Sequence, residues 1–420
     1  MSFPHSKLPD KSLIESKNGT RALSILSRFW GYSAFRPGQL DVIESVLSGR
    51  DTLALLPTGG GKSICFQVPG MVLGGVTLVV SPLISLMHDQ VSALMSRGIG
   101  AFSMTGFVDP GIYSHLLERI RQSECFFVYV APERLKGQQM LNLIKTCSIR
   151  LIAVDEAHCI SSWGHDFRPE YREIAAVRKL LPSVPVCAVT ATATPRTVRD
   201  IAKNLKMVAP TFVKGSFDRP NIRFSVVQQT DARREVLQLL HQTKGAVVVY
   251  DSTRVGVEVW SEKLRLAGIS AVGYHAGMSD EDRQKAQRAW MRKKVRVIVA
   301  TNAFGMGIDR PDVRSVVHVG VPGTMEAYYQ EAGRAGRDGR PAHAYLIVTP
   351  DAIQSRNAII EGKKGLRNVA AKRRAKRLFG FLKRYADRKM CRRWAILGYF
   401  GQTAPSACGN CDICLDAPAQ

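Results

Sequence analysis

Short apolar runs alternate with segments of helix length along most of this 420-residue chain. Alternation of this kind predicts a parallel β-sheet covered by helices. In the first part, from about residue 21 to residue 208, the expected strands are residues 52–56, 76–80, 126–130, 151–154 and 186–189.

A second series of the same kind follows residues 211–224. It predicts another sheet, so the expected fold class is α/β, with two parallel-sheet domains in tandem. The stretch around Gly215 and Pro220 is the expected linker, and a cleft between two such domains is a usual place for a ligand. The expected strands of this second series are residues 246–250, 295–300, 315–319 and 344–348.

The composition is that of a globular protein, with 45% apolar and 22% charged residues, and the length predicts about three domains. No apolar run approaches the ~20 residues of a membrane helix. The first twenty residues lack the apolar core of a secretory signal. We therefore expect no membrane association and a protein that stays in the compartment where it is made.

The formal net charge of +24 points to a polyanionic partner, with nucleic acid favoured over an anionic membrane. Residues 351–400 contain 15 Lys and Arg against 3 acidic residues, a net +12 that is half of the total. A solvated helix face is the ordinary alternative, but such a face usually alternates in sign. This region is therefore the first candidate for contact with nucleic acid.

The sequence LLPTGGGKS, residues 55–63, follows an expected strand and precedes an expected helix, which is the setting of a phosphate-binding loop. Its glycines let backbone N–H groups face phosphate oxygens, while Lys62 can reach the β and γ phosphates and Ser63 can ligate Mg²⁺. Leu56 stands where the usual pattern has its first glycine, and a flexible glycine turn is the alternative. The expected phosphate-binding residues are Thr58, Gly59, Gly60, Gly61, Lys62 and Ser63.

Two adjacent carboxylates, Asp155 and Glu156, follow the apolar run 151–154 directly. Ligands of open α/β sheets bind at the carboxyl ends of the strands, where this pair is expected to lie. Alone, such a pair is more often an ordinary exit from a strand. Together with the phosphate loop, Asp155 becomes the carboxylate on the Mg²⁺ side and Glu156 the candidate base for an attacking water. His158 is ambiguous, although it could link the site to its surroundings.

The sequence QEAGRAGRDG, residues 330–339, places Arg334 and Arg337 where they could project together across an interdomain cleft. A guanidinium delivered to a γ-phosphate in the transition state is worth ~10³ to 10⁵ in rate. We therefore interpret both residues as arginine fingers, with Arg337 preferred. Contacts to nucleic-acid phosphates or plain surface charge are the alternatives.

Four of the nine cysteines, Cys391, Cys408, Cys411 and Cys414, form the pattern C-x16-C-x2-C-x2-C. Four thiolates suit a closed tetrahedral structural Zn²⁺ site. Redox chemistry or an iron–sulfur cluster is the alternative. The other five cysteines are scattered among apolar neighbours, which is not a disulfide framework.

These features together resemble those of the superfamily-two helicases, and within them the RecQ-type ATP-dependent DNA helicases. The resemblance covers residues 21–415 approximately. Each further motif alone could be a loop or a strand end, but their order and spacing are those of the family. The motifs are GYSAFRPGQ (31–39), SPLISLMHDQV (81–91), APERL (131–135), TATAT (190–194), YHAGM (274–278) and ATNAFGMGID (300–309).

The resemblance implies that ATP is the nucleotide, with Gln39 bonded to adenine and Tyr32 and Arg36 packed on the base. It implies two tandem RecA-like helicase domains followed by a small helical zinc-binding subdomain. The expected ranges are 1–20 for an N-terminal extension, 21–208 and 209–348 for the helicase domains, and 349–420 for the basic zinc-binding subdomain. A winged-helix domain and a C-terminal helical domain, which many members carry, are absent from this sequence, so we expect a short form or a shortened chain.

The aromatic-rich loop after the acidic pair, residues 161–171, is taken in RecQ-like proteins to sense single-stranded DNA. Here Trp163 and Phe167 offer faces on which bases can stack, and Arg168 adds charge. A place in the core is the alternative for both rings. In the basic segment 371–394, the residues expected to track DNA phosphates, and to make binding salt-dependent, are Lys372, Arg373, Arg374, Lys376 and Arg377.

The family resemblance predicts 3′–5′ translocation on single-stranded DNA and duplex unwinding in DNA repair and recombination. The alternatives are an RNA helicase, a DNA-stimulated translocase without unwinding, and a strand-annealing protein with ATP as a switch. Expected partners are single-stranded and partly duplex DNA, with single-stranded-DNA-binding and recombination proteins as further candidates. The expected location is the nucleoid in the cytoplasm of a bacterium, which we favour, or a eukaryotic nucleus.

Overall fold

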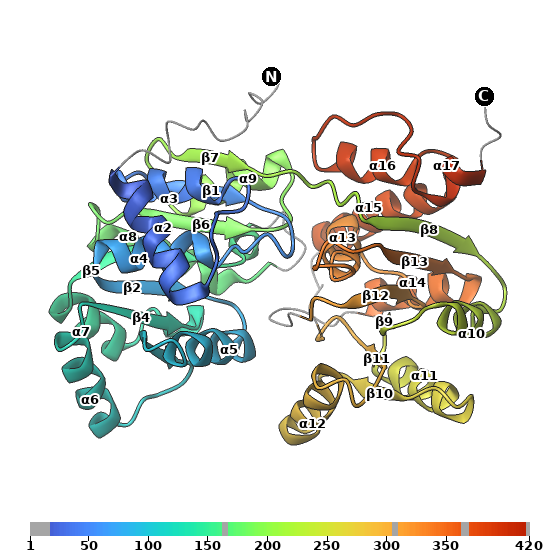
Figure 1. Ribbon diagram of the computed structural model, residues 1–420, viewed down its shortest axis with the longest axis horizontal. Coiled ribbons are helices and arrows are strands. Elements are labelled where there is room, and N and C mark those ends of the chain that lie inside the picture. Colours follow the sequence, from blue (N-terminus) through green and yellow to red (C-terminus); the bar gives the residue numbers. More distant parts are fainter. Residues whose placement is uncertain (1–16, 162–166, 305–309, 363–368, 417–420) are drawn as a thin grey trace. The chain divides into compact units, whose positions relative to one another are not determined.

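The computed structural model describes residues 17–161, 167–304, 310–362 and 369–416. The chain divides into two compact units, Met1–Ser216 and Phe217–Gln420, called here the first and the second unit (Figure 1). Their boundary lies within the stretch that the sequence suggests as a linker. The finer ranges given above for the domains stay predictions.

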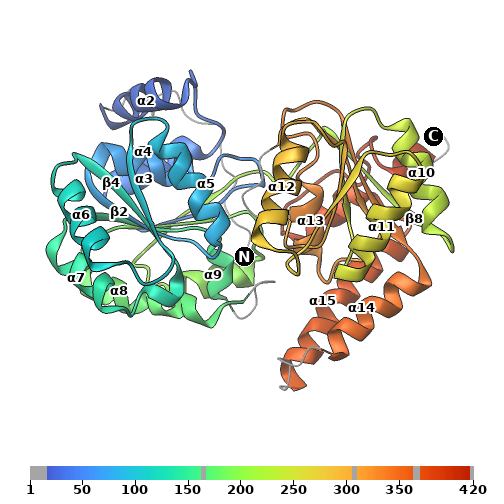
Figure 2. The same cartoon turned by 90° about the horizontal axis from the view of Figure 1, so that it is seen from below.

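The first unit contains a seven-stranded sheet in the order β3-β4-β2-β5-β6-β1-β7, and every strand pair is parallel. Helices cover both faces, with α3, α4 and α5 on one side and α7, α8 and α9 on the other (Figure 2). The strands are β1 Thr52–Leu55, β2 Gly75–Val80, β3 Gly100–Met104, β4 Cys125–Val130, β5 Ile149–Val154, β6 Val186–Thr190 and β7 Thr211–Lys214. The helices are α2 Lys17–Trp30, α3 Gln39–Leu47, α4 Ile64–Leu73, α5 Ile84–Met95, α6 Pro110–Arg121, α7 Gln138–Thr146, α8 Ile174–Leu180 and α9 Pro195–Asn204, with short 3₁₀ turns at Pro132–Arg134, Ala157–Ile160 and Pro169–Glu173.

The second unit contains a six-stranded parallel sheet in the order β10-β11-β9-β12-β13-β8. Its strands are β8 Ile222–Gln228, β9 Ala246–Tyr250, β10 Ala271–Tyr274, β11 Val297–Ala300, β12 Val313–His318 and β13 Ala342–Val348. Its helices are α10 Ala232–Gln242, α11 Arg254–Leu266, α12 Asp280–Met291, α13 Met325–Ala332, α14 Pro350–Gly362, α15 Val369–Asp387, α16 Arg392–Tyr399 and α17 Asp412–Asp416.

All nine strands expected from apolar runs are present, and each lies in the interior of its sheet. The four strands without such a run, β3, β7, β8 and β10, are the edge strands. An edge strand has a neighbour on one side only, so fewer of its residues are buried and its sequence signal is weaker. Strand β7 pairs with β1, so residues 211–214 belong to the sheet of the first unit.

The core of the first unit forms where α3, α4 and α5 pack on the sheet. Phe66 on α4 and Met87 on α5 are fully buried against strand residues such as Tyr129. Burying one such side chain stabilises the fold by ~1.5 to 3 kcal/mol. Several helices begin at side-chain caps, for example α6, where the Asp109 carboxylate accepts from the Gly111 N–H at 2.8 Å. Burial therefore fixes α3, α4 and α5 on the sheet, whereas α6 and α9 also have side-chain caps.

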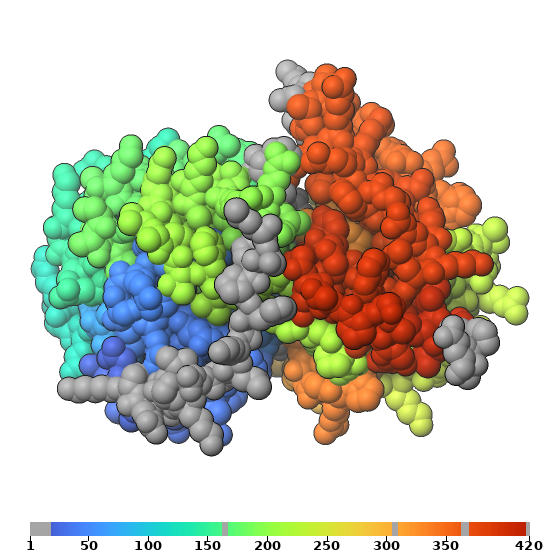
Figure 3. All heavy atoms as spheres, turned by 90° about the horizontal axis from the view of Figure 1, so that it is seen from above, coloured from blue at the N-terminus to red at the C-terminus, as the bar shows by residue number. Residues whose placement is uncertain are grey.

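The edge strand β8 is covered by the C-terminal region of the second unit. Phe224 on β8 forms a parallel bridge with Cys411, and the Asp412 carboxylate accepts from the Val226 N–H at 2.9 Å. Helices α14 and α15 run side by side and are joined by the Lys376–Glu361 ion pair at 2.6 Å (Figure 2). In Figure 3 the C-terminal residues, coloured red, form one continuous surface on the second unit. Covering β8 removes an exposed row of backbone groups that would otherwise invite pairing with another chain.

None of the helices in the described ranges is both long enough and apolar enough to span a membrane.

The buried carboxylate of Asp51 joins three parts of the first unit at the start of β1. It accepts from Arg178 Nη2 at 3.1 Å and from the backbone N–H groups of Val186 and Val208, each at 2.8 Å. We expect Asp51→Ala to lower the free energy of unfolding by ~3 to 5 kcal/mol, because Arg178 would remain charged and buried without its partner.

Urea denaturation followed by circular dichroism measures this loss. The exposed cap variant Asp109→Ala is the matched control and should cost only ~1 kcal/mol. Equal losses in the two variants would show that the Asp51 interaction contributes no more than an ordinary cap.

Candidate nucleotide and zinc sites

The loops that follow β1 and β5 meet at one edge of the first sheet. The strand order β5-β6-β1 and the parallel pairing bring the carboxyl ends of these strands together. The loop after β1 carries Lys62, and β5 ends directly before Asp155. Lys62 lies close enough to oppose protonation of Asp155. The fold therefore brings the predicted phosphate loop and the predicted acidic pair to one place.

The phosphate loop needs its glycines for geometric reasons. Gly59 and Gly61 have positive φ values of 80° and 72°, which other residues rarely adopt. A Cβ on Gly60 would lie 2.8 Å from the Pro57 carbonyl oxygen, and one on Gly61 would lie 2.5 Å from Gln39 Nε2. Ser63 directly precedes α4, so the loop opens onto a helix N-terminus, the usual setting for phosphate.

The predicted adenine-reading residues pack against this loop. Buried Gln39 donates from Nε2 to the carbonyl oxygens of Gly60 at 3.1 Å and Gly61 at 3.0 Å. Its Oε1 accepts from the Arg36 N–H at 2.8 Å, and the Arg36 guanidinium donates to the Gly59 carbonyl. Tyr32 is 53% exposed. The structure thus joins the segment 31–39 to the phosphate loop, while the contact of these residues with a base stays a prediction.

Both acidic residues after β5 are buried, with Asp155 4% and Glu156 6% exposed. Asp155 Oδ1 accepts from the Glu156 N–H at 2.9 Å, and Glu156 has a left-handed φ of 44°. Burial, followed by repulsion from Glu156, raises the pKa of Asp155 to about 6, although Lys62 opposes the shift. A buried carboxylate of this kind is stabilised by a bound cation, so Asp155, with Ser63 from the loop after β1, fits the expected Mg²⁺ site.

A chain of hydrogen-bonded amide and hydroxyl groups leads to Asp155 from the buried Gln67 of α4 through the buried Tyr129 to the half-buried Gln90. Gln67 Nε2 donates to the Tyr129 hydroxyl at 3.0 Å, and that hydroxyl donates to Gln90 Oε1 at 2.8 Å. Gln90 Nε2 then faces Asp155 Oδ2 at 3.4 Å. Sequence reasoning missed these three residues. Gln90 lies in the quoted motif 81–91, but the sequence does not indicate which groups the side chain of a polar helix residue contacts.

His158 connects the acidic pair to the TATAT motif. Its Nδ1 lies 3.3 Å from Glu156 Oε2 and 2.9 Å from the Thr190 hydroxyl, and the side chain is fully buried. Thr190 is the last residue of β6. The sequence only suggested that His158 links the site to its surroundings. In the structure His158 contacts Glu156 and Thr190 directly.

The loop after the acidic pair is described only in part, and Trp163 lies outside the described residues. Phe167 is half-buried, with the Arg172 guanidinium 5.2 Å from its ring centroid. Arg168 donates from Nη1 to the Pro82 carbonyl oxygen at 2.6 Å, which ties the loop to the motif 81–91. The role of Trp163, Phe167 and Arg168 in DNA binding stays a prediction.

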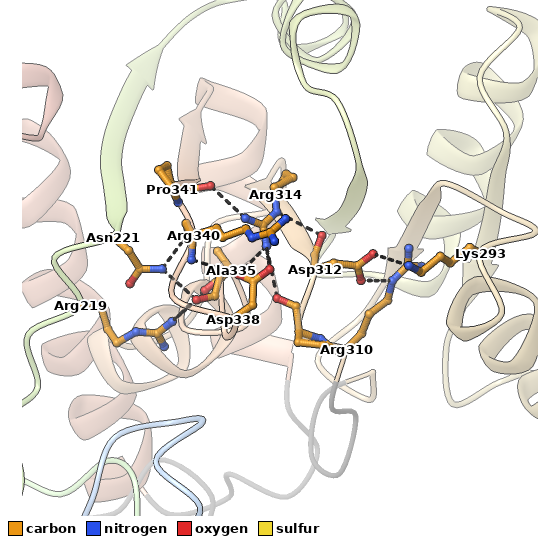
Figure 4. Close-up of polar contacts among 12 residues, drawn as sticks. Arg219, Asn221, Lys293, Arg310, Asp312, Arg314, Ala335, Asp338, Arg340 and Pro341 are labelled. Carbon is orange, nitrogen blue, oxygen red and sulfur yellow. Dashed lines mark hydrogen bonds and ion pairs between the residues drawn. The ribbon is translucent and has the colours of Figure 1, made fainter. Parts of the chain in front are cut away.

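Arg334 and Arg337 lie in the second unit, just after α13. Arg334 is 5% exposed and lies beside the Tyr250 hydroxyl. The turns around the two arginines are held by side chains from other segments, including Arg219, Asn221 and Arg314 (Figure 4). Their action as arginine fingers stays a prediction.

The four cysteines of the predicted zinc site converge. The sulfur atoms of Cys391, Cys408, Cys411 and Cys414 all lie within 4.8 Å of one another. Backbone N–H groups face the sulfurs, as Trp394 does for Cys391 at 3.5 Å and Asn410 for Cys408 at 3.4 Å. Four sulfurs at this spacing with N–H donors fit a tetrahedral Zn²⁺ site. Within the described ranges no other such cluster is found.

The zinc-site segment is attached to the second sheet by two buried arginines. Arg392 pairs with Asp412 through Nε at 3.0 Å and also donates to the Tyr385 carbonyl oxygen at 2.6 Å. Arg393 donates from Nη2 to the Ile222 carbonyl oxygen at 2.9 Å, at the start of β8. These contacts add to the burial of apolar residues such as Ile396 and Phe400 in holding the segment in place.

The basic residues of α15 differ in their surroundings. Arg373 is exposed, whereas Arg374 has a buried Nε and lies near Tyr399. Lys376 pairs with Glu361. Some of the basic side chains that were expected to contact DNA therefore interact with other residues of this chain. Contact of Arg373 and Arg374 with DNA stays a prediction.

Two parallel sheets, with a glycine loop and an acidic pair at one sheet edge, define a protein with two RecA-like domains. The models of three protein families match: DEAD/DEAH box helicase at residues 36–201, helicase conserved C-terminal domain at 231–339, and RecQ zinc-binding at 350–415. The chain is 41% identical to the ATP-dependent DNA helicase RecQ of Pasteurella multocida over 402 residues, 95% of this chain and 63% of that protein. It is 39% identical to RecQ of Bacillus subtilis over 402 residues, 95% of this chain and 68% of that protein. The chain belongs to the RecQ family, which confirms the resemblance.

Solved structures agree on the fold. The helicase Lhr of Mycobacterium smegmatis, solved with single-stranded DNA and AMP-PNP, is 19% identical with a TM-score of 0.61, covering 81% of this chain and 50% of its own. The DUF1998 helicase MrfA, solved with DNA, is also 19% identical with a TM-score of 0.66, covering 83% and 53%. The predicted fold class, two RecA-like parallel-sheet domains followed by a zinc-binding region, is confirmed.

The raised pKa of Asp155 generates a prediction about pH. A carboxyl group whose pKa is higher in the folded than in the unfolded chain costs stability when ionised, and this cost disappears as the pH falls below about 6. We expect Asp155→Asn to raise the free energy of unfolding at pH 8 by on the order of 2 kcal/mol, since one pKa unit is worth ~1.4 kcal/mol. The advantage should shrink steadily between pH 6 and pH 4.

Thermal melting of both proteins across this pH range, without nucleotide or Mg²⁺, measures the effect. An asparagine variant that is less stable than the parent at pH 8 would contradict the assigned burial of the charge.

The cysteine cluster generates a prediction about metal and about β8. Cys411→Ser should lower the zinc content from about one ion per chain, because a structural site needs all four ligands. It should also speed hydrogen exchange at Val226, whose N–H is held by Asp412 next to Cys411. Metal analysis and exchange mass spectrometry provide the measurements. Cys147→Ser, outside the cluster, is the control and should retain zinc; equal zinc in both variants would refute the site.

Proposed function

We propose that this protein is an ATP-dependent DNA helicase that couples Mg-ATP hydrolysis to 3′–5′ movement along single-stranded DNA and to separation of duplexes. The observation that supports this most directly is the meeting of Lys62, Ser63, Asp155 and Glu156 at one sheet edge in a member of the RecQ family. The direction of movement and the role in DNA repair and recombination come from the family. The chain spans 63% and 68% of the two RecQ relatives, so the activity of the whole protein belongs to this proposal.

At the nucleotide site, Lys62 and the loop N–H groups hold the phosphates, and Ser63 and Asp155 hold Mg²⁺. The metal neutralises phosphate charge when it is bound. Glu156 orients the attacking water and accepts its proton. His158 fixes the Glu156 carboxylate through the 3.3 Å contact and ties it to Thr190. Tyr32, Arg36 and Gln39 select adenine.

The second unit supplies Arg334 and Arg337, which stabilise the charge that develops on the transferred phosphate. Because these residues belong to a different unit from Lys62, hydrolysis depends on both units acting together. This dependence is what turns a hydrolysis cycle into stepwise movement along a strand.

DNA recognition falls to two regions. The loop with Trp163, Phe167 and Arg168 provides stacking faces and charge, and Arg168 is bonded to Pro82 of the motif 81–91. The arm with Arg373 and Arg374 adds phosphate contacts that weaken as salt rises. Single-stranded-DNA-binding and recombination proteins are the proposed protein partners, and the bacterial relatives support a location with the nucleoid.

The function is tested by ATP hydrolysis with and without single-stranded DNA or RNA, and by unwinding of a duplex with a 3′ overhang. We expect stimulation by DNA, and a loss of at least ~10²-fold in Glu156→Gln because the base is removed while the fold is kept. Asp109→Asn, at an exposed helix cap, is the matched control and should leave the rate unchanged.

Absence of DNA-stimulated turnover would overturn the helicase assignment, and stronger stimulation by RNA would point to an RNA helicase. Stimulation by DNA without strand separation would instead identify a translocase.

A further inference from the structure

The residues directly after the boundary between the units hold the segment that carries Arg334 and Arg337. This segment, residues 330–339, is called here the arginine segment. Arg219 donates from Nη1 to the Gly333 carbonyl oxygen at 2.9 Å, and from Nη2 to those of Ala335 at 2.9 Å and Gly336 at 3.1 Å (Figure 4). One guanidinium thus bonds the backbone on both sides of Arg334.

Asn221 closes the other end of the same turn. Its Nδ2 donates to the carbonyl oxygens of Gly336 at 2.8 Å and Arg340 at 2.9 Å, which lie on both sides of Arg337. Gly336 has a φ of 53°, and a Cβ there would lie 2.5 Å from Asn221 Nδ2. The Asn221 amide therefore occupies the space that a Cβ at position 336 would need. An aspartate at position 221 would have no N–H to donate.

Helix α13 ends at Ala332, within the arginine segment, so Arg334 and Arg337 lie in the turns that follow the helix. The following turns have backbone hydrogen bonds, such as that from the Gly336 N–H to the Val313 carbonyl oxygen at 2.8 Å. Side chains add to them, with Arg314 pairing with Asp338 through Nη2 at 2.7 and 2.6 Å on the side opposite Arg219 (Figure 4). The carbonyl oxygens on both sides of Arg334 and Arg337 are bonded by Arg219 and Asn221, so removal of one of these donors is expected to shift the residues between them.

Residues 217–222 are held in turn by the zinc-site region. The ring of Phe217 stacks on Phe400 with centroids 4.6 Å apart, and its N–H donates to Gln402 Oε1 at 2.8 Å. Asn410 Nδ2, between two cysteines of the cluster, donates to the Pro220 carbonyl oxygen at 3.1 Å. Residues 217–222 therefore lie between the zinc-site region and the arginine segment and are bonded to both.

We propose that Arg219 and Asn221 are positioning residues that set the placement of Arg334 and Arg337 for ATP hydrolysis. Residues 217–222 then do more than connect the two units, because two of their side chains bond the backbone on both sides of each arginine. The inference depends on the proposed role of these arginines. A displacement of about 1 Å at a catalytic group can cost ~10²-fold in rate, so small shifts of the arginine segment matter.

The test uses Arg219→Lys and Asn221→Asp in the full chain. Lysine keeps the charge but cannot offer the fork of donors, and aspartate keeps the shape of asparagine but loses the donor. We expect kcat for DNA-stimulated ATP hydrolysis to fall ~10- to 100-fold, with KM for ATP and affinity for ADP within ~2-fold of the parent. Affinity for ADP with aluminium fluoride, which imitates the transferring phosphate, should fall with kcat.

Arg296→Lys is the matched control. Arg296 also donates to three backbone carbonyl oxygens, those of Leu240 in α10 and of Thr243 and Gly245 after it, none of which belongs to the arginine segment. It should lose similar stability in thermal melting while keeping kcat.

If Arg296→Lys loses kcat as strongly as Arg219→Lys, the loss reflects general destabilisation, and the inference is overturned. Parental kcat in both Arg219→Lys and Asn221→Asp, with Arg334→Ala inactive, would overturn the inference alone. Full activity in both Arg334→Ala and Arg337→Ala would remove the proposed role of the arginines, and the inference with it.

Discussion

The parallel pairing of β5, β6 and β1 is the constraint on which the candidate nucleotide site depends. Parallel strands end at the same edge of a sheet, so Lys62 and Asp155, almost a hundred residues apart in sequence, become neighbours without a dedicated contact. The same geometry buries Asp155 and Glu156 at the end of an apolar strand. A buried carboxylate pair beside a lysine is costly by itself and is stabilised by a cation, which connects the fold of the first unit to its expected chemistry.

The second unit differs, since Arg334 and Arg337 lie in turns after the end of α13 and outside any regular helix or strand. Its carbonyl oxygens are bonded by Arg219 and Asn221, and Arg314 holds Asp338 on the opposite side. The cysteine cluster contributes at a distance, because the region around it covers β8 and bonds residues 217–222. A zinc-binding segment in this position supports the sheet edge and the arginine segment through the same contacts.

Sequence reasoning succeeded for strands with neighbours on both sides and failed for the edges. Residues such as 247–249 in β9 are buried on both faces and read as an apolar run, whereas β10, with Val272 and Gly273 partly exposed, does not. The phosphate loop, the acidic pair and the cysteines could be proposed from the sequence because their expected chemistry demands particular residues at particular spacings, and their roles stay predictions. Gln67, Tyr129 and Gln90 were missed, since hydrogen-bonding partners separated by tens of residues have no local pattern.

The sequence by itself determined the fold class, the family and the residues whose chemistry is local: the glycines before Lys62, the pair Asp155 and Glu156, and the four cysteines. Only the tertiary structure decided which side chains support them, as Gln90 does for Asp155, His158 for Glu156, and Arg219 for the backbone around Arg334. The physical reason is the range of the interactions. Turn conformations and ligand spacings act between near neighbours in the chain, whereas a buried amide or guanidinium finds its partners only after the sheets have brought distant segments together.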